Sequence, residues 1–241
     1  MGNEVNTYSL NEIKHDILRV YASSTYQKIN AYYCNDNIFS IIGKSRSENL
    51  HSNFLYWLFN CNSNHGLGVY PIQMLLRVID YAKTKSINQG VHISKYYDCF
   101  IDNINKIRDV EIYKEETLRS EEKNNRRIDL LFIINYIDEL KLPQLIIVLE
   151  NKVNSLEHNN QTSDYYNRIQ AIRDKNVEHI FLYLSPGSYC LNRRQCESDK
   201  FIQLNYQLLL DYIIQPCKSR CTSTEANFYL ENYIRCLGDR R

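Results

Sequence analysis

The sequence predicts an α/β fold with a mixed central sheet flanked by helices. Two apolar, β-branched runs, 128–134 and 145–149, are separated by a polar stretch with Pro143, as in neighbouring strands joined by a turn. Both runs are almost continuously apolar, so we expect both strands to be buried on both faces. A helical pattern at 161–172, followed by an apolar run at 178–185, adds the strand–helix–strand order of a mixed sheet covered by helices.

The remaining elements follow from local patterns. Short alternating or apolar runs predict a first strand at 110–116 and a last strand at 201–204. Capping residues and amphipathic spacing predict the helices, at 9–33 (opened by the capping box Ser9–Glu12), 47–59, 71–81 (starting at Pro71), 206–214 (ended by Pro216) and 226–237 (closed by Gly238). We expect residues 1–46 to be an added N-terminal helical extension and residues 47–241 to form the main domain.

Composition limits the function classes. The chain has 241 residues, and its 44% hydrophobic content is enough for one good core. The net charge is +1, from 29 basic and 28 acidic residues, so no global basic field marks a nucleic-acid binder. A binding groove for nucleic acid would therefore have to be local.

The cysteines and the termini bear on location. The N-terminal residues lack the apolar core of a secretory signal, and no segment is long and apolar enough to span a membrane. We therefore expect a cytoplasmic protein with no membrane partner and with eight reduced cysteines. Four of them, Cys190, Cys196, Cys217 and Cys221, lie in one C-terminal region, but their spacing matches no zinc pattern.

Three charged residues stand at the ends of the two most apolar strands. Asp129 opens the first run, and Glu150 and Lys152 end the second, two residues apart and hence on one side of a strand. Two neighbouring carboxylates favour a cation between them, and hard oxygen ligands suit Mg²⁺ or Mn²⁺. An ordinary salt bridge at a strand end is the alternative.

Flanking motifs extend this pattern. The order of these features resembles the motif of the PD-(D/E)XK nuclease superfamily: an acid comes first, then a strand–turn–strand gap, and then Glu-x-Lys at the end of a strand. The block E-x-L-H-S-x-F-L-x-W-L from Glu48, followed by H-G-x-G from His65, is similar to an uncharacterised bacterial branch of it, as is the pair Gln161 and Tyr165 after Lys152. The resemblance covers roughly residues 47–237 and implies a restriction-endonuclease-like sheet.

The resemblance also implies roles for individual residues. Asp129, Glu150 and the backbone carbonyl of Asn151 would coordinate Mg²⁺ or Mn²⁺. Glu48, which shares a helix face with Ser52, would be a fourth acidic site residue, and Lys152 would position the attacking water. By the resemblance, Gln161 and Tyr165 would contact phosphate or support the metal ligands, with a polar solvent face as the alternative. Apart from the resemblance, Arg127, next to Asp129, and His51 are candidates for substrate contact by position, and a solvated surface role is the alternative for Arg127. For Glu48 the alternative is a helix-dipole acid, and for His51 a structural hydrogen bonder.

The function that this resemblance implies is a metal-dependent phosphodiesterase, a DNA endonuclease acting in bacterial defence against foreign DNA. DNA is favoured over RNA as the partner, although no residue separates the two. The alternative is a catalytically silent module that kept the fold and binds nucleic acid or protein. Two assembly states stay open, a homodimer and a complex with a partner subunit. Six arginines could line a phosphate track: Arg126, Arg127, Arg168, Arg173, Arg193 and Arg194.

Overall fold

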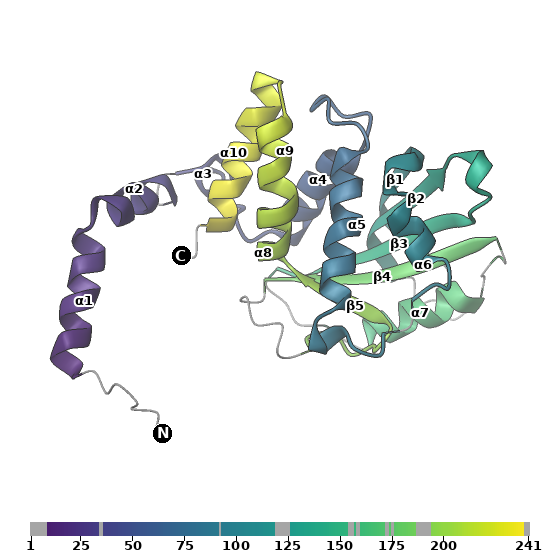
Figure 1. Cartoon of the computed structure of the whole chain (residues 1–241), viewed down its shortest axis with the longest axis horizontal. Helices are drawn as coiled ribbons and strands as arrows, with labels where there is room; N and C mark the ends of the chain where they lie inside the picture. Colours follow the sequence, from purple (N-terminus) through teal and green to yellow (C-terminus); the bar gives the residue numbers. More distant parts are fainter. Residues whose placement is uncertain are drawn as a thin grey trace, which may run out of the picture.

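A five-stranded mixed sheet forms the centre of the molecule (Figure 1). The computed structural model describes residues 9–33, 36–91, 93–118, 126–153, 157, 160–171, 174, 176–186 and 194–238. The strands are β1 (Ile107–Leu118), β2 (Arg126–Tyr136), β3 (Gln144–Asn151), β4 (Val177–Ser185) and β5 (Phe201–Asn205), in that order across the sheet. The pairs β1–β2 and β2–β3 are antiparallel, and β3–β4 and β4–β5 are parallel. The predicted mixed sheet is confirmed.

Helices cover both faces of this sheet unequally. One face carries most of them: α4 (Glu48–Phe59), α5 (Tyr70–Lys83), α8 (Tyr206–Leu209), η4 (Leu210–Ile214), α9 (Gln215–Arg220) and α10 (Thr224–Gly238) (Figure 1). The other carries α7 (Gln161–Ala171). Short connecting helices are η1 (Ser86–Asn88), α6 (Tyr97–Asp102), η2 (Ile104–Lys106) and η3 (Asp138–Leu140).

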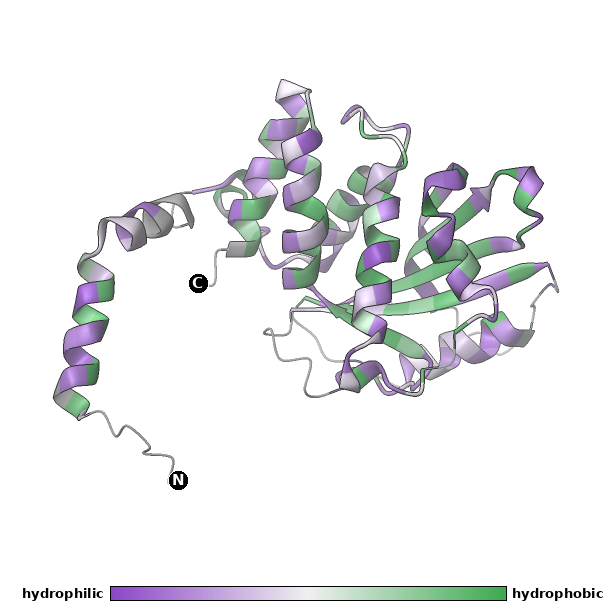
Figure 2. Cartoon of the chain, in the orientation of Figure 1, coloured by the Kyte–Doolittle hydropathy of each residue, from purple (hydrophilic) through white to green (hydrophobic). Residues whose placement is uncertain are grey.

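The hydrophobic core has two parts, one on each face of the sheet. The larger apolar cluster fills the space between the sheet and the α4–α5–α10 side, and a smaller one lies under α7. Figure 2 shows the strands as the most hydrophobic part of the molecule. Burial on both faces is observed for β3 from Ile147 onward, but the expectation is wrong for β2, whose residues from Ile128 onward alternate between buried and half-buried. The small α7 layer does not extend fully over β2, so its outer residues keep contact with solvent.

Strand β2 changes face close to Asp129. Ile128 belongs to the cluster under α7, whereas Leu130, two residues later, belongs to the larger cluster on the opposite face. In a regular strand both would lie on one side. Glu115, the residue of β1 at the level of Asp129, has a φ of 55°, in the left-handed region that non-glycine residues rarely adopt. The backbone distortion therefore lies at the position of the candidate acid.

The N-terminal segment forms two helices where the sequence predicted one. α1 (Leu10–Ala22) has the predicted capping box of Ser9 and Glu12, and α2 (Ser24–Tyr33) follows it. Ser23 separates them because its backbone is extended, and its hydroxyl donates to the Val20 carbonyl and accepts from the Tyr26 N–H. α3 (Ile38–Ile41) packs on α10. The limit of the N-terminal extension at residue 46 stays a prediction.

Pro216 does not end a helix, contrary to the sequence-based prediction. The chain passes from α8 through the π-helical segment η4 into α9, and Pro216 occupies the first turn of α9. The wider i→i+5 hydrogen bonding before it accommodates a residue that has no N–H to donate.

Within the described ranges, no helix is both long and apolar enough to cross a bilayer.

Candidate active site

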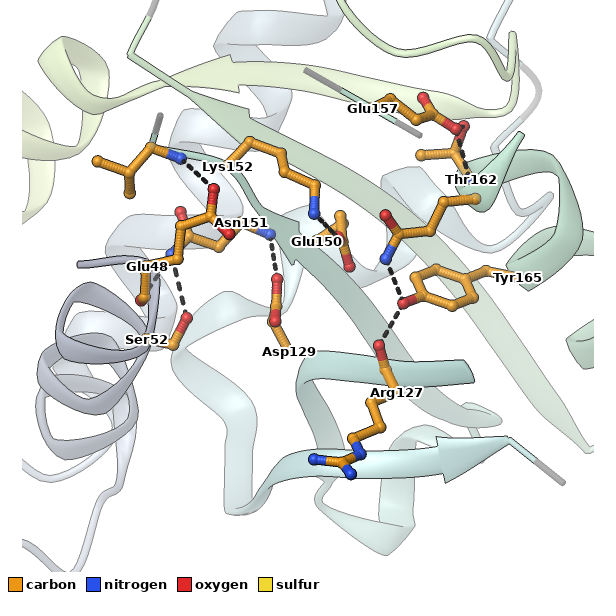
Figure 3. A network of polar contacts seen from close by, with 12 residues as sticks. Glu48, Ser52, Arg127, Asp129, Glu150, Asn151, Lys152, Glu157, Thr162 and Tyr165 are labelled. Atoms are coloured by element: carbon orange, nitrogen blue, oxygen red, sulfur yellow. Dashed lines mark hydrogen bonds and ion pairs between the residues drawn. The ribbon is translucent and has the colours of Figure 1, made fainter. Parts of the chain in front are cut away.

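The paired acids lie just outside the last rung of the β2–β3 ladder. Leu130 and Leu149 are the final partners, so Asp129 and Glu150 come next on their two strands, where the strands separate. The main-chain N–H of Asn151 donates a 2.7 Å hydrogen bond to Asp129 Oδ2 (Figure 3). This bond ties the carboxylate of one strand to the end of the next.

Glu150 and Lys152 share a side of the chain, as the period of a strand predicts. Lys152 Nζ lies 2.7 Å from Glu150 Oε1, and their side chains are only 12% and 1% exposed. The backbone of Lys152 stays attached to β4, because its N–H donates to the Leu184 carbonyl at 2.9 Å. The second carboxylate oxygen, Glu150 Oε2, is fully enclosed and has no hydrogen-bond partner among the described residues.

Burial controls the titration of these groups. Burial and the neighbouring Asp129 charge raise the pKa of Glu150 to about 8, and burial together with Glu48 raises the pKa of Asp129. Burial alone would lower the pKa of Lys152, but three carboxylates outweigh it and raise that pKa. The site therefore holds more negative charge than its single ammonium balances, and a cation would relieve it.

The donor set fits a hard divalent cation. Asp129 and Glu150 supply carboxylate oxygens from two adjacent strands, and Asn151 supplies a carbonyl between Glu150 and Lys152. No group of three or more His, Cys, Asp and Glu side chains is gathered as a metal cage in the part of the chain that the structure describes. Two acids and a carbonyl suit Mg²⁺, which keeps several of its waters and rarely uses a cage made only of protein ligands.

Glu48 reaches the same strand end from the first turn of α4. Its Oε1 accepts a 3.2 Å hydrogen bond from the Val153 N–H, and its charge acts on Asp129 and on Lys152. One turn later, Ser52 Oγ accepts a 3.0 Å bond from the Asn151 side chain. The helix face that Glu48 and Ser52 share is thus the face turned to the strand end (Figure 3).

A model of the PD-(D/E)XK nuclease superfamily matches residues 36–235, well over half of the chain. The chain belongs to the PD-(D/E)XK nuclease superfamily. The sheet and its flanking helices form the restriction-endonuclease-like fold, and membership indicates a nuclease-type function with a nucleic-acid substrate. Comparisons with curated proteins and with solved structures found no match.

In this PD-(D/E)XK protein, Gln161 and Tyr165 form a pair one turn apart on α7. Gln161 Nε2 donates to the Tyr165 hydroxyl at 2.6 Å, and that hydroxyl donates to the backbone carbonyl of Arg127. Burial raises the pKa of Tyr165, and the charge of the nearby Glu150 raises it further. The pair thus bridges α7 to β2 beside the acids.

The Arg127 side chain lies apart from this bridge. This side chain is 70% exposed, its guanidinium forms a 3.6 Å ion pair with Glu115, and it extends away from the acids in Figure 3. Its contact with the site is through its backbone carbonyl. Substrate contact by its side chain stays a prediction.

The other arginines of the expected phosphate track have internal contacts. Arg126 and Arg168 both pair with Asp164 on α7, at 3.1 and 2.9 Å. The Arg194 guanidinium donates to the backbone carbonyls of Ile87, Ser198 and Phe201, which is a structural role. Arg173 and Arg193 lie outside the described residues.

His51 is held inside the protein. The residue is 3% exposed, and its ring has Nδ1 at 2.7 Å from the Tyr233 hydroxyl and Nε2 at 2.9 Å from the Ser45 carbonyl. A carbonyl only accepts, so Nε2 carries a proton, and burial lowers the pKa of His51. The ring is then neutral, and Tyr233 donates to Nδ1. This geometry corresponds to the structural alternative for His51, because neither ring nitrogen is left for a substrate.

The cysteines within the described residues do not gather into a metal site. Cys196 packs under α7, whereas Cys217 and Cys221 lie in the larger cluster on the other side of the sheet. The sheet therefore separates Cys196 from the other two. Cys190 lies outside the described residues, and the described cysteines are free thiols.

Sequence reasoning missed two groups at the site. The Tyr206 hydroxyl donates a 2.6 Å hydrogen bond to the Asn151 side-chain oxygen, and nothing in the pattern distinguishes this residue among 20 tyrosines. Glu157 accepts from the N–H and the hydroxyl of Thr162, at 2.6 and 2.7 Å, and so holds the first turn of α7. The sequence offers only a weak signal for Glu157, an acid shortly before a predicted helix.

Proposed function

We propose that this protein is a Mg²⁺- or Mn²⁺-dependent endonuclease that hydrolyses phosphodiester bonds in DNA. The observation that carries the proposal is the enclosed Asp129–Glu150–Lys152 cluster, in which one carboxylate oxygen has no partner in the described structure. Such a buried, unpaired oxygen is costly unless a cation or a proton meets it. Action against foreign DNA is the biological role that we attach to this activity.

The chain's own residues have distinct roles in this proposal. Asp129, Glu150 and the Asn151 carbonyl would hold the metal, with Glu48 reaching it directly or through water. The bound metal would polarise the scissile phosphate and lower the pKa of a water. Lys152, fixed by Glu150 at 2.7 Å, would orient that water and offset the charge that develops on phosphate oxygens.

A second candidate is a catalytically silent module that binds nucleic acid or protein. One observation favours it: α1 exposes an apolar stripe that includes Leu10 at 68% and Ile17 at 49% exposure. Such a face suits a partner subunit or a second copy. It does not account for the cost of the buried acids, so we place it second.

The test is cleavage of supercoiled plasmid DNA with Mg²⁺ or Mn²⁺, with and without a chelator. Asp129→Asn and Lys152→Ala are the site variants. Asp109→Asn is the matched control, because Asp109 lies toward the other end of β1 and bonds Asn135 at 2.7 Å. We expect metal-dependent nicking by the parent and the control only. Equal nicking by all four proteins would identify a contaminant and refute the proposal.

A further inference from the structure

The Asn151 side chain is enclosed at the centre of the site. It is completely buried, and both ends of its amide have partners. Its oxygen accepts from the Tyr206 hydroxyl at 2.6 Å, and its nitrogen donates to Ser52 Oγ at 3.0 Å and lies 3.4 Å from the Glu48 carbonyl. One amide therefore joins the end of β3 to the starts of both α4 and α8.

The backbone of the same residue carries the groups that matter for a metal. The Asn151 N–H holds Asp129 Oδ2, and its carbonyl lies between Glu150 and Lys152. Side chains alternate along a strand, so the Asn151 amide points away from the face of Glu150 and Lys152. The contacts of this amide therefore fix the backbone from the face opposite Glu150 and Lys152, and they leave the face of the proposed metal site open.

Tyr206 is itself held firmly. It lies in the larger core cluster, and the ring of His51 meets it edge-on at a centroid distance of 5.3 Å. His51 is fixed in turn between Ser45 and Tyr233. The hydroxyl that donates to Asn151 therefore belongs to a buried tyrosine whose ring has little freedom to move.

We propose that Tyr206 and Ser52 are positioning residues: by clamping the Asn151 amide they hold its N–H against Asp129 and its carbonyl toward the metal. The inference rests on the proposed metal site. Partners behind metal ligands typically contribute about 10- to 100-fold in metal affinity or activity. In this protein the residues that make that contribution to metal affinity, Tyr206 on α8 and Ser52 on α4, lie outside the acid–lysine motif.

The first measurement does not depend on metal or activity. Tyr206→Phe removes one hydroxyl and keeps the ring, and Ser52→Ala tests the other side of the clamp. Tyr136→Phe is the matched control, since Tyr136 is buried and donates a 3.0 Å bond to the Phe100 carbonyl in another part of the core. Amide hydrogen exchange of Asn151, read by NMR relative to the Ile147 amide of the same strand, should quicken at least about tenfold in Tyr206→Phe and Ser52→Ala. It should not change in Tyr136→Phe.

The second measurement is the Kd for Mn²⁺ by calorimetry. Tyr206→Phe should weaken binding by about 10-fold or more, and Tyr136→Phe should leave it unchanged. In an Asn151→Ala background, Tyr206→Phe should cause no further weakening, because its hydroxyl has lost its acceptor. Melting temperatures show whether each variant is folded. If Tyr206→Phe does not fold, the Ser52→Ala variant provides the test of the clamp.

The outcomes separate the two proposals. A parent protein that binds no Mn²⁺ overturns the metal site, whatever the amide data show. An Asn151 amide whose relative exchange is unchanged in both clamp variants overturns the positioning role, even where Mn²⁺ binds. Equal weakening of Mn²⁺ binding by Tyr206→Phe with and without Asn151 would also overturn it, since the hydroxyl would then act by another route.

Discussion

Asp129 Oδ2 accepts a hydrogen bond of 2.7 Å from the main-chain N–H of Asn151, so the acid of β2 is bonded to the residue that follows the acid of β3. The two strands no longer pair at this level, and the side chain takes the place of the next ladder bond. Two carboxylates are thereby held together at a buried edge, next to one lysine.

Lys152→Met should strongly slow cleavage while leaving the protein folded. The substitution keeps the apolar stem and removes the ammonium that lies 2.7 Å from Glu150. Loss of a group that stabilises transition-state charge lowers the rate about 100-fold or more. Glu150 can take up a proton when its partner is removed, so the melting temperature should fall only modestly. Single-turnover plasmid cleavage and thermal unfolding are the measurements.

Lys200→Met is the matched control for this substitution, because Lys200 pairs only with Asp199 at the start of β5 in the described structure. Full cleavage by Lys152→Met would contradict the role given to the ammonium.

The metal-free protein should lose stability as pH rises toward 8. Folded Glu150 has a pKa of about 8 and keeps a proton that the unfolded chain releases near pH 4.5. The free energy of unfolding should therefore fall across this window, by at most about 1.4 kcal/mol per pH unit. Glu150→Gln should remove this component. Urea titrations at several pH values compare the two proteins, and parallel pH profiles would contradict the raised pKa.

Divalent metal should stabilise the protein more at pH 8 than at pH 5.5. Ligand carboxylates must be ionised to bind, and burial favours their protonated forms at the lower pH. Thermal unfolding with Mn²⁺ or with chelator measures the difference. An equal metal effect at both pH values, or the same effect in Asp129→Asn, would place the ion elsewhere.

Glu48→Gln separates the charge of Glu48 from its structural contact. Glutamine keeps an oxygen that can accept from the Val153 N–H, so the melting temperature should hold. Loss of the charge should lower the cleavage rate by about tenfold, which corresponds to an increase of roughly 1.4 kcal/mol in the activation free energy. Glu48→Ala should lower both quantities. If Glu48→Gln cleaves at the parental rate, Glu48 serves only to hold the backbone after Lys152.

His51→Ala should lower stability more than activity. It removes two buried or partly buried hydrogen bonds, one to the Tyr233 hydroxyl and one to the Ser45 carbonyl, at a cost of about 2–4 kcal/mol in the free energy of unfolding. The turnover of the molecules that remain folded at low temperature should fall less than tenfold. A large loss of turnover with unchanged stability would show instead that His51 contacts substrate.

Local signals in the sequence suffice for much of this fold. Apolar runs predict β2 and β3, and alternation with the following helix predicts the mixed sheet, because these patterns depend on near neighbours. The break at Ser23 and the helix that continues past Pro216 escaped prediction because both depend on particular hydrogen bonds of the backbone. The half-buried face of β2 depends on how far α7 extends, which no local pattern records.

The sequence by itself determined that two acids and a lysine stand at the ends of the two most apolar strands, and that Glu48 and Ser52 share a helix face. Strand and helix periods suffice for both statements. Only the tertiary structure decided what surrounds them: that Asn151 N–H meets Asp129, that one Glu150 oxygen is enclosed, and that Tyr206 grips Asn151 from α8. Such contacts join residues up to 105 positions apart, as between Glu48 and Val153, and chain folding alone brings them together.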